Sequence, residues 1–76
     1  MRFYFDTLNG GRCRDSEGQE LSSLEEVQDE AVQALVDMGK DELAHIKSGR
    51  VSVKVRDDSG KTILTASLIL NIERRH

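Results

Sequence analysis

Four aspartates offer the most direct route to chemistry in this sequence of 76 residues. They are Asp6, Asp15, Asp57 and Asp58. Carboxylate oxygens are the ligands that Mg²⁺ and Ca²⁺ prefer, so a cluster of them could hold a divalent cation. Their spacing matches no calcium-binding loop, and three of them stand in predicted turns, where an aspartate accepts hydrogen bonds from turn amides. We therefore expect turn capping and no metal site.

Acid–base catalysis is the second chemistry that paired carboxylates could perform. It needs a pocket in which the acid, the base and the substrate converge. A short chain that folds as a sheet with one helix has little volume for such a pocket. We predict no catalytic residues, no cofactor and no enzymatic activity.

The single cysteine, Cys13, lies between Arg12 and Arg14. Positively charged neighbours raise the reactivity of a thiol. One cysteine cannot form an intramolecular disulfide, however, and His45 and His76 stand at no spacing that would complete a zinc site or a nucleophilic pair with it. We interpret Cys13 as a residue of an edge strand.

Basic side chains could contact nucleic acid if they share a surface with an aromatic ring. The candidates, on the outer sheet face or in the C-terminal tail, are Lys54, Arg56, Arg74 and Arg75, with Tyr4 as the aromatic residue. One ring is too few for a stacking platform, and a net charge of −3 weighs against binding that depends on phosphate neutralisation. Nucleic-acid binding by the outer sheet face is the alternative function.

The segment from Ser22 to Ile46 has the periodicity of an amphipathic helix. At 100° per residue its apolar face consists of Leu24, Val27, Ala31, Ala34, Leu35, Met38 and Ile46. The opposite face is acidic. This is the only segment long enough to organise a core, so the other elements must pack against it.

The ends of this helix are marked by capping residues. Ser23 with Glu26 forms a capping box, and the pair one residue earlier offers the same chemistry. Gly39 costs about 1 kcal/mol relative to alanine inside a helix. Gly39 is therefore the position at which the helix could break and restart at Asp41, and the sequence leaves this open.

Alternation of apolar and polar residues predicts strands at 2–8, 51–57 and 62–73, with a minor strand at 12–14. Two turns of similar sequence, 15–18 and 57–60, each place an aspartate early and a glycine late. Across the second turn the apolar residues meet if Val55 faces Leu64, Val53 faces Ala66 and Val51 faces Leu68, with Asp57 facing Thr62. The predicted fold is α+β, in the order β-β-α-β-β, with one long helix on a small antiparallel sheet.

Some apolar residues lie outside the predicted core. Val32, Val36 and Leu43 form a second stripe on the helix, and the sheet face away from the helix carries Tyr4, Leu8, Ile63 and Ile69. A chain of this size buries only about 60% of its unfolded surface, so a partner that covers exposed apolar groups would stabilise it. We predict a homodimer with an interface formed by Val32, Val36, Leu43, Tyr4 and Ile69.

Several segments resemble a family of short bacterial domains of unknown function. They are Phe3-Tyr4-Phe5-Asp6, Asp15-x-x-Gly18-x-Glu20-Leu21, Leu24-Glu25-Glu26-Val27 with Glu30-Ala31 following, and Val55-Arg56-Asp57-x-x-Gly60. Ser23 departs from the family pattern, in which aspartate is expected, and either residue serves as an N-cap. The resemblance implies an α+β fold and lends no activity.

The sequence contains no apolar run of signal-peptide length near its start and no stretch close to the roughly 20 apolar residues of a membrane span. We expect a single cytoplasmic domain over residues 1–76 that makes no membrane contact. The predicted function is that of a small, non-catalytic interaction module that self-associates or binds an unknown protein partner.

Overall fold

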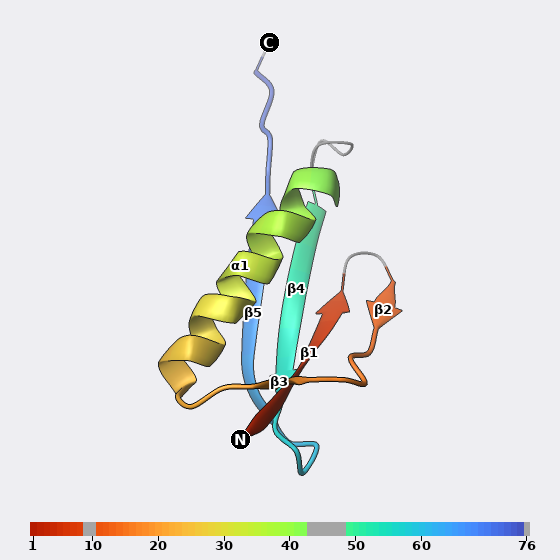
Figure 1. The fold of residues 1–76 in the computed structure, drawn as a ribbon. Helices are drawn as coiled ribbons and strands as arrows, with labels where there is room; N and C mark the ends of the chain where they lie inside the picture. The colour runs from red at the N-terminus through yellow and green to blue at the C-terminus, as the bar shows by residue number, and fades with distance from the viewer. Residues whose placement is uncertain (9–10, 43–48, 76) are drawn as a thin grey trace.

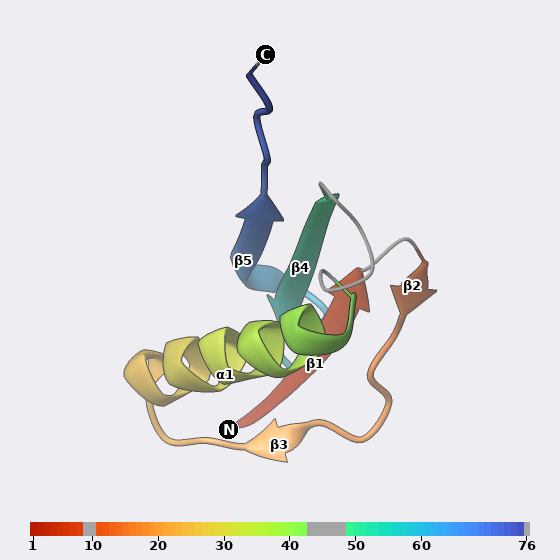
Figure 2. The same cartoon turned by 90° about the horizontal axis from the view of Figure 1, so that it is seen from above.

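The computed structural model describes residues 1–8, 11–42 and 49–75. The strands are β1 (Arg2–Leu8), β2 (Arg12–Cys13), β3 (Gln19–Glu20), β4 (Gly49–Arg56) and β5 (Thr62–Leu70), and the helix is α1 (Leu24–Glu42). The helix covers one face of an antiparallel sheet, so the fold has two layers (Figures 1 and 2). The predicted α+β class is confirmed.

The sheet has the strand order β2-β1-β4-β5, and β3 pairs with the same edge of β1 as β2 does. The minor strand predicted at 12–14 is present as β2, one residue shorter, and the structure adds the short strand β3 at the other end of β1, which was not predicted. Between them the chain leaves the sheet around Asp15, whose side chain occupies the place that a pairing strand would take. The observed order is therefore the predicted one with β3 inserted before the helix.

The hairpin of β4 and β5 has the register that the apolar pattern predicted. Val55 faces Leu64, Val53 faces Ala66 and Val51 faces Leu68. The predicted pairing of Asp57 with Thr62 is wrong, because a bulge between Val55 and Arg56 places Arg56 opposite Thr62.

The same bulge decides where Ile63 lies. This residue was expected on the outer face of the sheet, yet it packs against the core. An extra residue in one strand shifts the alternation of its side chains. The strand then ends at Leu70, and the predicted extension to residue 73 forms an irregular tail that projects past the sheet (Figure 1).

The helix begins where the capping pattern predicted. The Ser23 Oγ accepts a hydrogen bond from the Glu26 N–H at 3.2 Å, and the Ser22 hydroxyl donates to the Glu26 carboxylate. The question left open at Gly39 is answered by the structure: α1 continues through this buried glycine to Glu42 without a break.

The core lies between the helix and the centre of the sheet. Its buried apolar residues are Phe3, Val27, Ala31, Leu35, Val51, Val53 and Val55. Leu24 was predicted to belong to it, but its side chain is 68% exposed, because the first turn of α1 lies at the rim of the sheet. Ile46 and Leu43 lie outside the described residues.

Candidate functional site

The most concentrated polar chemistry lies on the outer face of the sheet, where Arg56 of β4 meets Asp6 of β1. The Arg56 Nε donates to Asp6 Oδ2 at 2.7 Å, and Nη2 donates to Asp6 Oδ1 at 3.1 Å. This two-point geometry is the strongest form of an arginine–carboxylate pair. The Asp6 side chain is 2% exposed and that of Arg56 12%, so the pair is almost removed from water.

Asp15 joins this ion pair to the edge of the sheet. Its N–H donates to Asp6 Oδ1 at 2.9 Å, and its carbonyl accepts from Arg56 Nη2 at 2.9 Å. Its own carboxylate accepts the Phe5 N–H at 3.0 Å, on the edge of β1 away from β4 and between the pairings with β3 and β2. The same carboxylate accepts the N–H groups of Glu17 and Gly18. Asp15 therefore holds the loop between β2 and β3 against β1.

Gly18 and Tyr4 close the network on its other side. The Arg56 guanidinium lies over the Tyr4 ring, 5.0 Å from its centroid. Gly18 has a φ of 71°, and a Cβ there would lie 2.9 Å from both the Phe3 carbonyl oxygen and a ring carbon of Tyr4. Only glycine allows the loop to approach the strand this closely.

The electrostatics of the network follow from these contacts. The Arg56 hydrogen bond lowers the pKa of Asp6, although burial acts in the opposite direction. Burial raises the pKa of Asp15, but the N–H groups of Phe5, Gly18 and Glu17 outweigh it and the net shift is downward. Both carboxylates are therefore held in the charged form.

The turn between β4 and β5 shows the aspartate chemistry that its sequence predicted. The Asp57 carboxylate accepts hydrogen bonds from the N–H groups of Ser59 and Lys61 and from the Ser59 hydroxyl, which lower its pKa. Gly60 follows with a φ of 89°. Turn capping by Asp15 and Asp57 is thus confirmed.

The four aspartates do not gather at one place. Asp6 and Asp15 share the Arg56 network, whereas Asp57 caps a different turn, in which Asp58 is exposed. Within residues 1–8, 11–42 and 49–75, no group of three or more His, Cys, Asp or Glu side chains is placed to hold one metal ion. In the same part of the chain no buried side-chain nitrogen or oxygen lacks a hydrogen-bond partner. The network holds the loop between β2 and β3 on the sheet. We call its residues, Tyr4, Asp6, Asp15, Gly18 and Arg56, the clamp.

The residues predicted to contact nucleic acid are not brought together. Arg56 and Tyr4 contact each other within the clamp. Lys54 is half-buried on the outer face. Arg74 and Arg75 lie in the tail beyond the end of β5, at the opposite end of the sheet from Arg56 (Figure 1).

The residues predicted to form an interface lie on two surfaces. Val32 and Val36 are 49% and 43% exposed on α1, and Ile69 is 66% exposed on β5. Tyr4 is on β1, two strands away from β5, and is half-buried. Leu43 falls outside the part of the chain that the structure describes.

The exposed flank of α1 faces the β5 side of the molecule. A hollow at the β1 edge is bordered by Glu26, Asp29, Glu30 and Gln33 of α1 together with Leu21, which follows β3. Val32 and Val36 lie about 120° to 160° around the helix from Glu30. They therefore extend along the side of the helix that overhangs β5. We call Val32, Val36 and Leu68 the β5-side strip; Ile69 follows Leu68 on β5 but points to the sheet face away from the helix.

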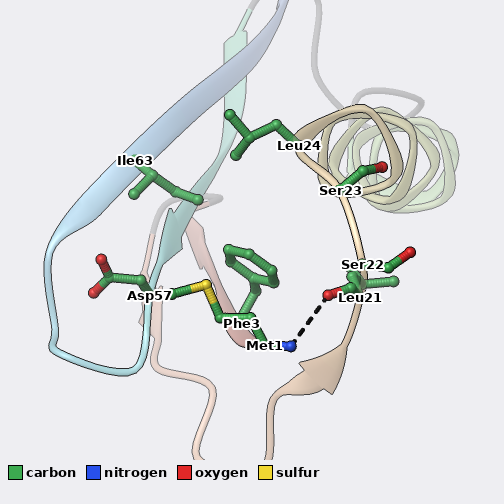
Figure 3. A pocket seen from close by; sticks show the side chains of 8 residues that line it. All are labelled: Met1, Phe3, Leu21, Ser22, Ser23, Leu24, Asp57 and Ile63. Carbon is green, nitrogen blue, oxygen red and sulfur yellow. Dashed lines mark hydrogen bonds between the residues drawn. The ribbon is translucent and has the colours of Figure 1, made fainter.

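An apolar cleft of about 290 Å³ opens at the first turn of α1 (Figure 3). It is lined by Met1, Phe3, Leu21, Ser22, Ser23, Leu24, Asp57 and Ile63. Its serine hydroxyls are already bonded to Glu26, and one oxygen of Asp57 caps its own turn. The cleft therefore suits an apolar group better than a polar small molecule.

These features define a small two-layer α+β domain in which a buried ion pair locks the sheet. Residues 2–69 match the family described as a domain of unknown function, DUF6894. Because the match covers most of the chain, this protein belongs to that family. No curated protein and no solved structure matches the chain. In the described part of the chain, no helix is long and apolar enough to cross a membrane.

The segments that carry the family resemblance contain residues of the clamp. Asp6, Asp15, Gly18 and Arg56 all belong to segments that carry it, and all four belong to the clamp. Sequence reasoning did not find the clamp, because Asp6 and Arg56 are 50 residues apart. The signal that could have found it was the presence of an acid and an arginine at matching outward positions of two predicted strands.

Proposed function

We propose that this protein is a small cytoplasmic interaction module that self-associates and performs no catalysis. The observation that carries the proposal is the β5-side strip, whose apolar side chains remain exposed outside the buried core. Contiguous exposed apolar surface commonly marks a protein interface.

The dimensions of the chain support this proposal. Its accessible surface is 5599 Å², whereas a folded monomer of this length exposes about 4,700 Å². The Cα radius of gyration is 13.9 Å, against about 11 Å for a compact domain of 76 residues. The tail beyond Leu70, which projects past the sheet (Figure 1), contributes to both excesses, and a second copy that packs along it would cover it.

The hydrogen-bond partners of the charged side chains support the proposal that the protein performs no catalysis. The carboxylates of Asp6 and Asp15 and the guanidinium of Arg56 are engaged by partners within the chain. A general acid or base must instead be free to exchange a proton with a substrate. The network therefore offers stability to an interaction domain and no reactive group.

Sedimentation velocity over about a hundredfold range of protein concentration tests the proposal. We expect a concentration-dependent dimer that Val36→Glu converts to a monomer, because a charge on the strip would be desolvated in the interface. Glu30→Lys changes the charge about 120° to 160° around the helix from Val36 and Val32 and should leave the dimer intact. A monomer at every concentration, or equal behaviour of the two variants, would contradict self-association through this surface.

A further inference from the structure

We propose that two copies of this chain pair through the free edges of their β5 strands, antiparallel and about a two-fold axis at Ala66. This inference rests on the proposed self-association and specifies its geometry. Among the described residues β5 pairs only with β4, so its other edge carries unpaired backbone N–H and C=O groups. Such an edge is a template for another strand.

The composition of β5 leaves this edge unprotected. Natural edge strands usually avoid pairing by means of charged residues, proline or short length. The nine residues of β5, Thr62–Leu70, contain no charge and no proline. Its bulge lies at the beginning, beside Val55 and Arg56, and leaves the stretch from Leu64 to Leu70 regular.

A two-fold axis at Ala66, the midpoint of the strand, makes the pairing self-complementary. Each Leu64 then faces Leu68 of the second copy, and each Thr65 faces Ser67 of the second copy. Leucines meet on the helix side and hydroxyls meet on the outer side, because directly opposed residues of antiparallel strands point to the same face. The second copy would cover Leu68, which is 38% exposed in the single chain.

The same axis brings the two helices together on one face of a continuous sheet. A two-fold perpendicular to the sheet keeps both α1 helices on the same side, with the flanks that overhang β5 facing each other. Val32 and Val36 of one copy then approach the same residues of the other. One interface thereby covers the helix flank and the strand edge together.

The C-terminal tail also acquires a partner in this arrangement. Beyond Leu70 the chain continues along the second copy toward that copy's β4–β5 turn, which carries Asp57 and Asp58. Arg74 and Arg75 of the tail complement this turn in charge. Ile72, which is 57% exposed, lies in the same tail and is an apolar residue that the second copy could cover.

Disulfide trapping tests the register, in a Cys13→Ser background that removes the native thiol. Ala66→Cys should form an intermolecular disulfide under mild oxidation, because directly opposed Cα atoms lie about 4.5 to 5.5 Å apart, within disulfide range. Ile69→Cys is the control. It is more exposed, yet its two copies would lie about 20 Å apart along the strands and should not link.

A strand-edge variant tests the pairing without relying on a cysteine. Thr65→Lys places a charge at an exposed position of the edge and should raise the dimer dissociation constant by about tenfold or more, with an unchanged circular dichroism spectrum. A dimer that persists in Thr65→Lys and links through Ile69→Cys instead of Ala66→Cys would overturn this geometry and leave self-association standing. A chain that stays monomeric would overturn both.

Discussion

Removal of the Arg56 side chain should destabilise this fold strongly, because it breaks an ion pair that is almost removed from water. In Arg56→Ala the Asp6 carboxylate, 2% exposed, keeps only the N–H of Asp15 as a partner. Breaking a buried ion pair on one side costs about 3 to 5 kcal/mol. The remaining N–H bond argues for the lower end, about 3 kcal/mol, out of a total of about 4 to 11 kcal/mol for a chain of this length.

The loss of stability caused by Arg56→Ala should become smaller as the pH falls. In the native protein the Asp6 pKa is lowered below 3.8, so its contribution to stability is present above that value and is lost as the pH falls through the folded pKa. In Arg56→Ala the largest lowering cause is gone and burial remains, so the folded pKa rises. The neutral carboxyl then needs no counter-charge, and the difference from the native protein should shrink on acidification.

Urea unfolding monitored by circular dichroism, at neutral pH and near pH 3, measures both effects. Lys54→Ala is the matched control, because Lys54 faces Asp6 directly in the strand register but is not hydrogen-bonded to it. We expect a cost of less than about 1 kcal/mol for this half-buried lysine. Equal costs for the two variants, or a cost of Arg56→Ala that does not change with pH, would refute the assignment of the clamp.

Three further predictions test other parts of the fold. Gly18→Ala should lower the free energy of unfolding by about 1 to 3 kcal/mol, because its Cβ would meet the Phe3 carbonyl and the Tyr4 ring at a positive φ. Gly11→Ala is the control and should change the urea midpoint little, because a Cβ there has no atom within 4 Å. Leu35→Ala should lower the free energy of unfolding by about 2 to 5 kcal/mol, and Leu24→Ala should lower it far less because Leu24 is mostly exposed. Similar melting temperatures of these two variants would contradict the placement of the helix. Asp57→Asn should lower stability at neutral pH and lose this deficit below about pH 4, since the pKa of Asp57 is lowered from 3.8; a deficit independent of pH would mean that the charge has no role in the turn.

The candidate site shows which interactions can be anticipated from local sequence. The aspartates of the two turns were expected to accept turn amides, and Asp15 and Asp57 do so, because the side chain and the amides lie within four residues of each other. Asp15 has a second role that was not anticipated, since it also bonds the Phe5 N–H across the sheet edge. That contact depends on a loop returning to β1 ten residues later, for which the sequence contains no local signal.

The sequence by itself determined the elements whose cause is local. The start of α1 follows from Ser23 and Glu26, and the β4–β5 register follows from alternating apolar residues joined by a short turn. Only the tertiary structure decided the partners of distant residues. Arg56 was read as an outward-facing charge, yet the pairing of β1 with β4 places it beside Asp6 and makes it the centre of a buried clamp. Leu24 followed the helical period, but the end of the sheet leaves it uncovered. Periodicity predicts the direction of a side chain, whereas burial depends on whether another element reaches it.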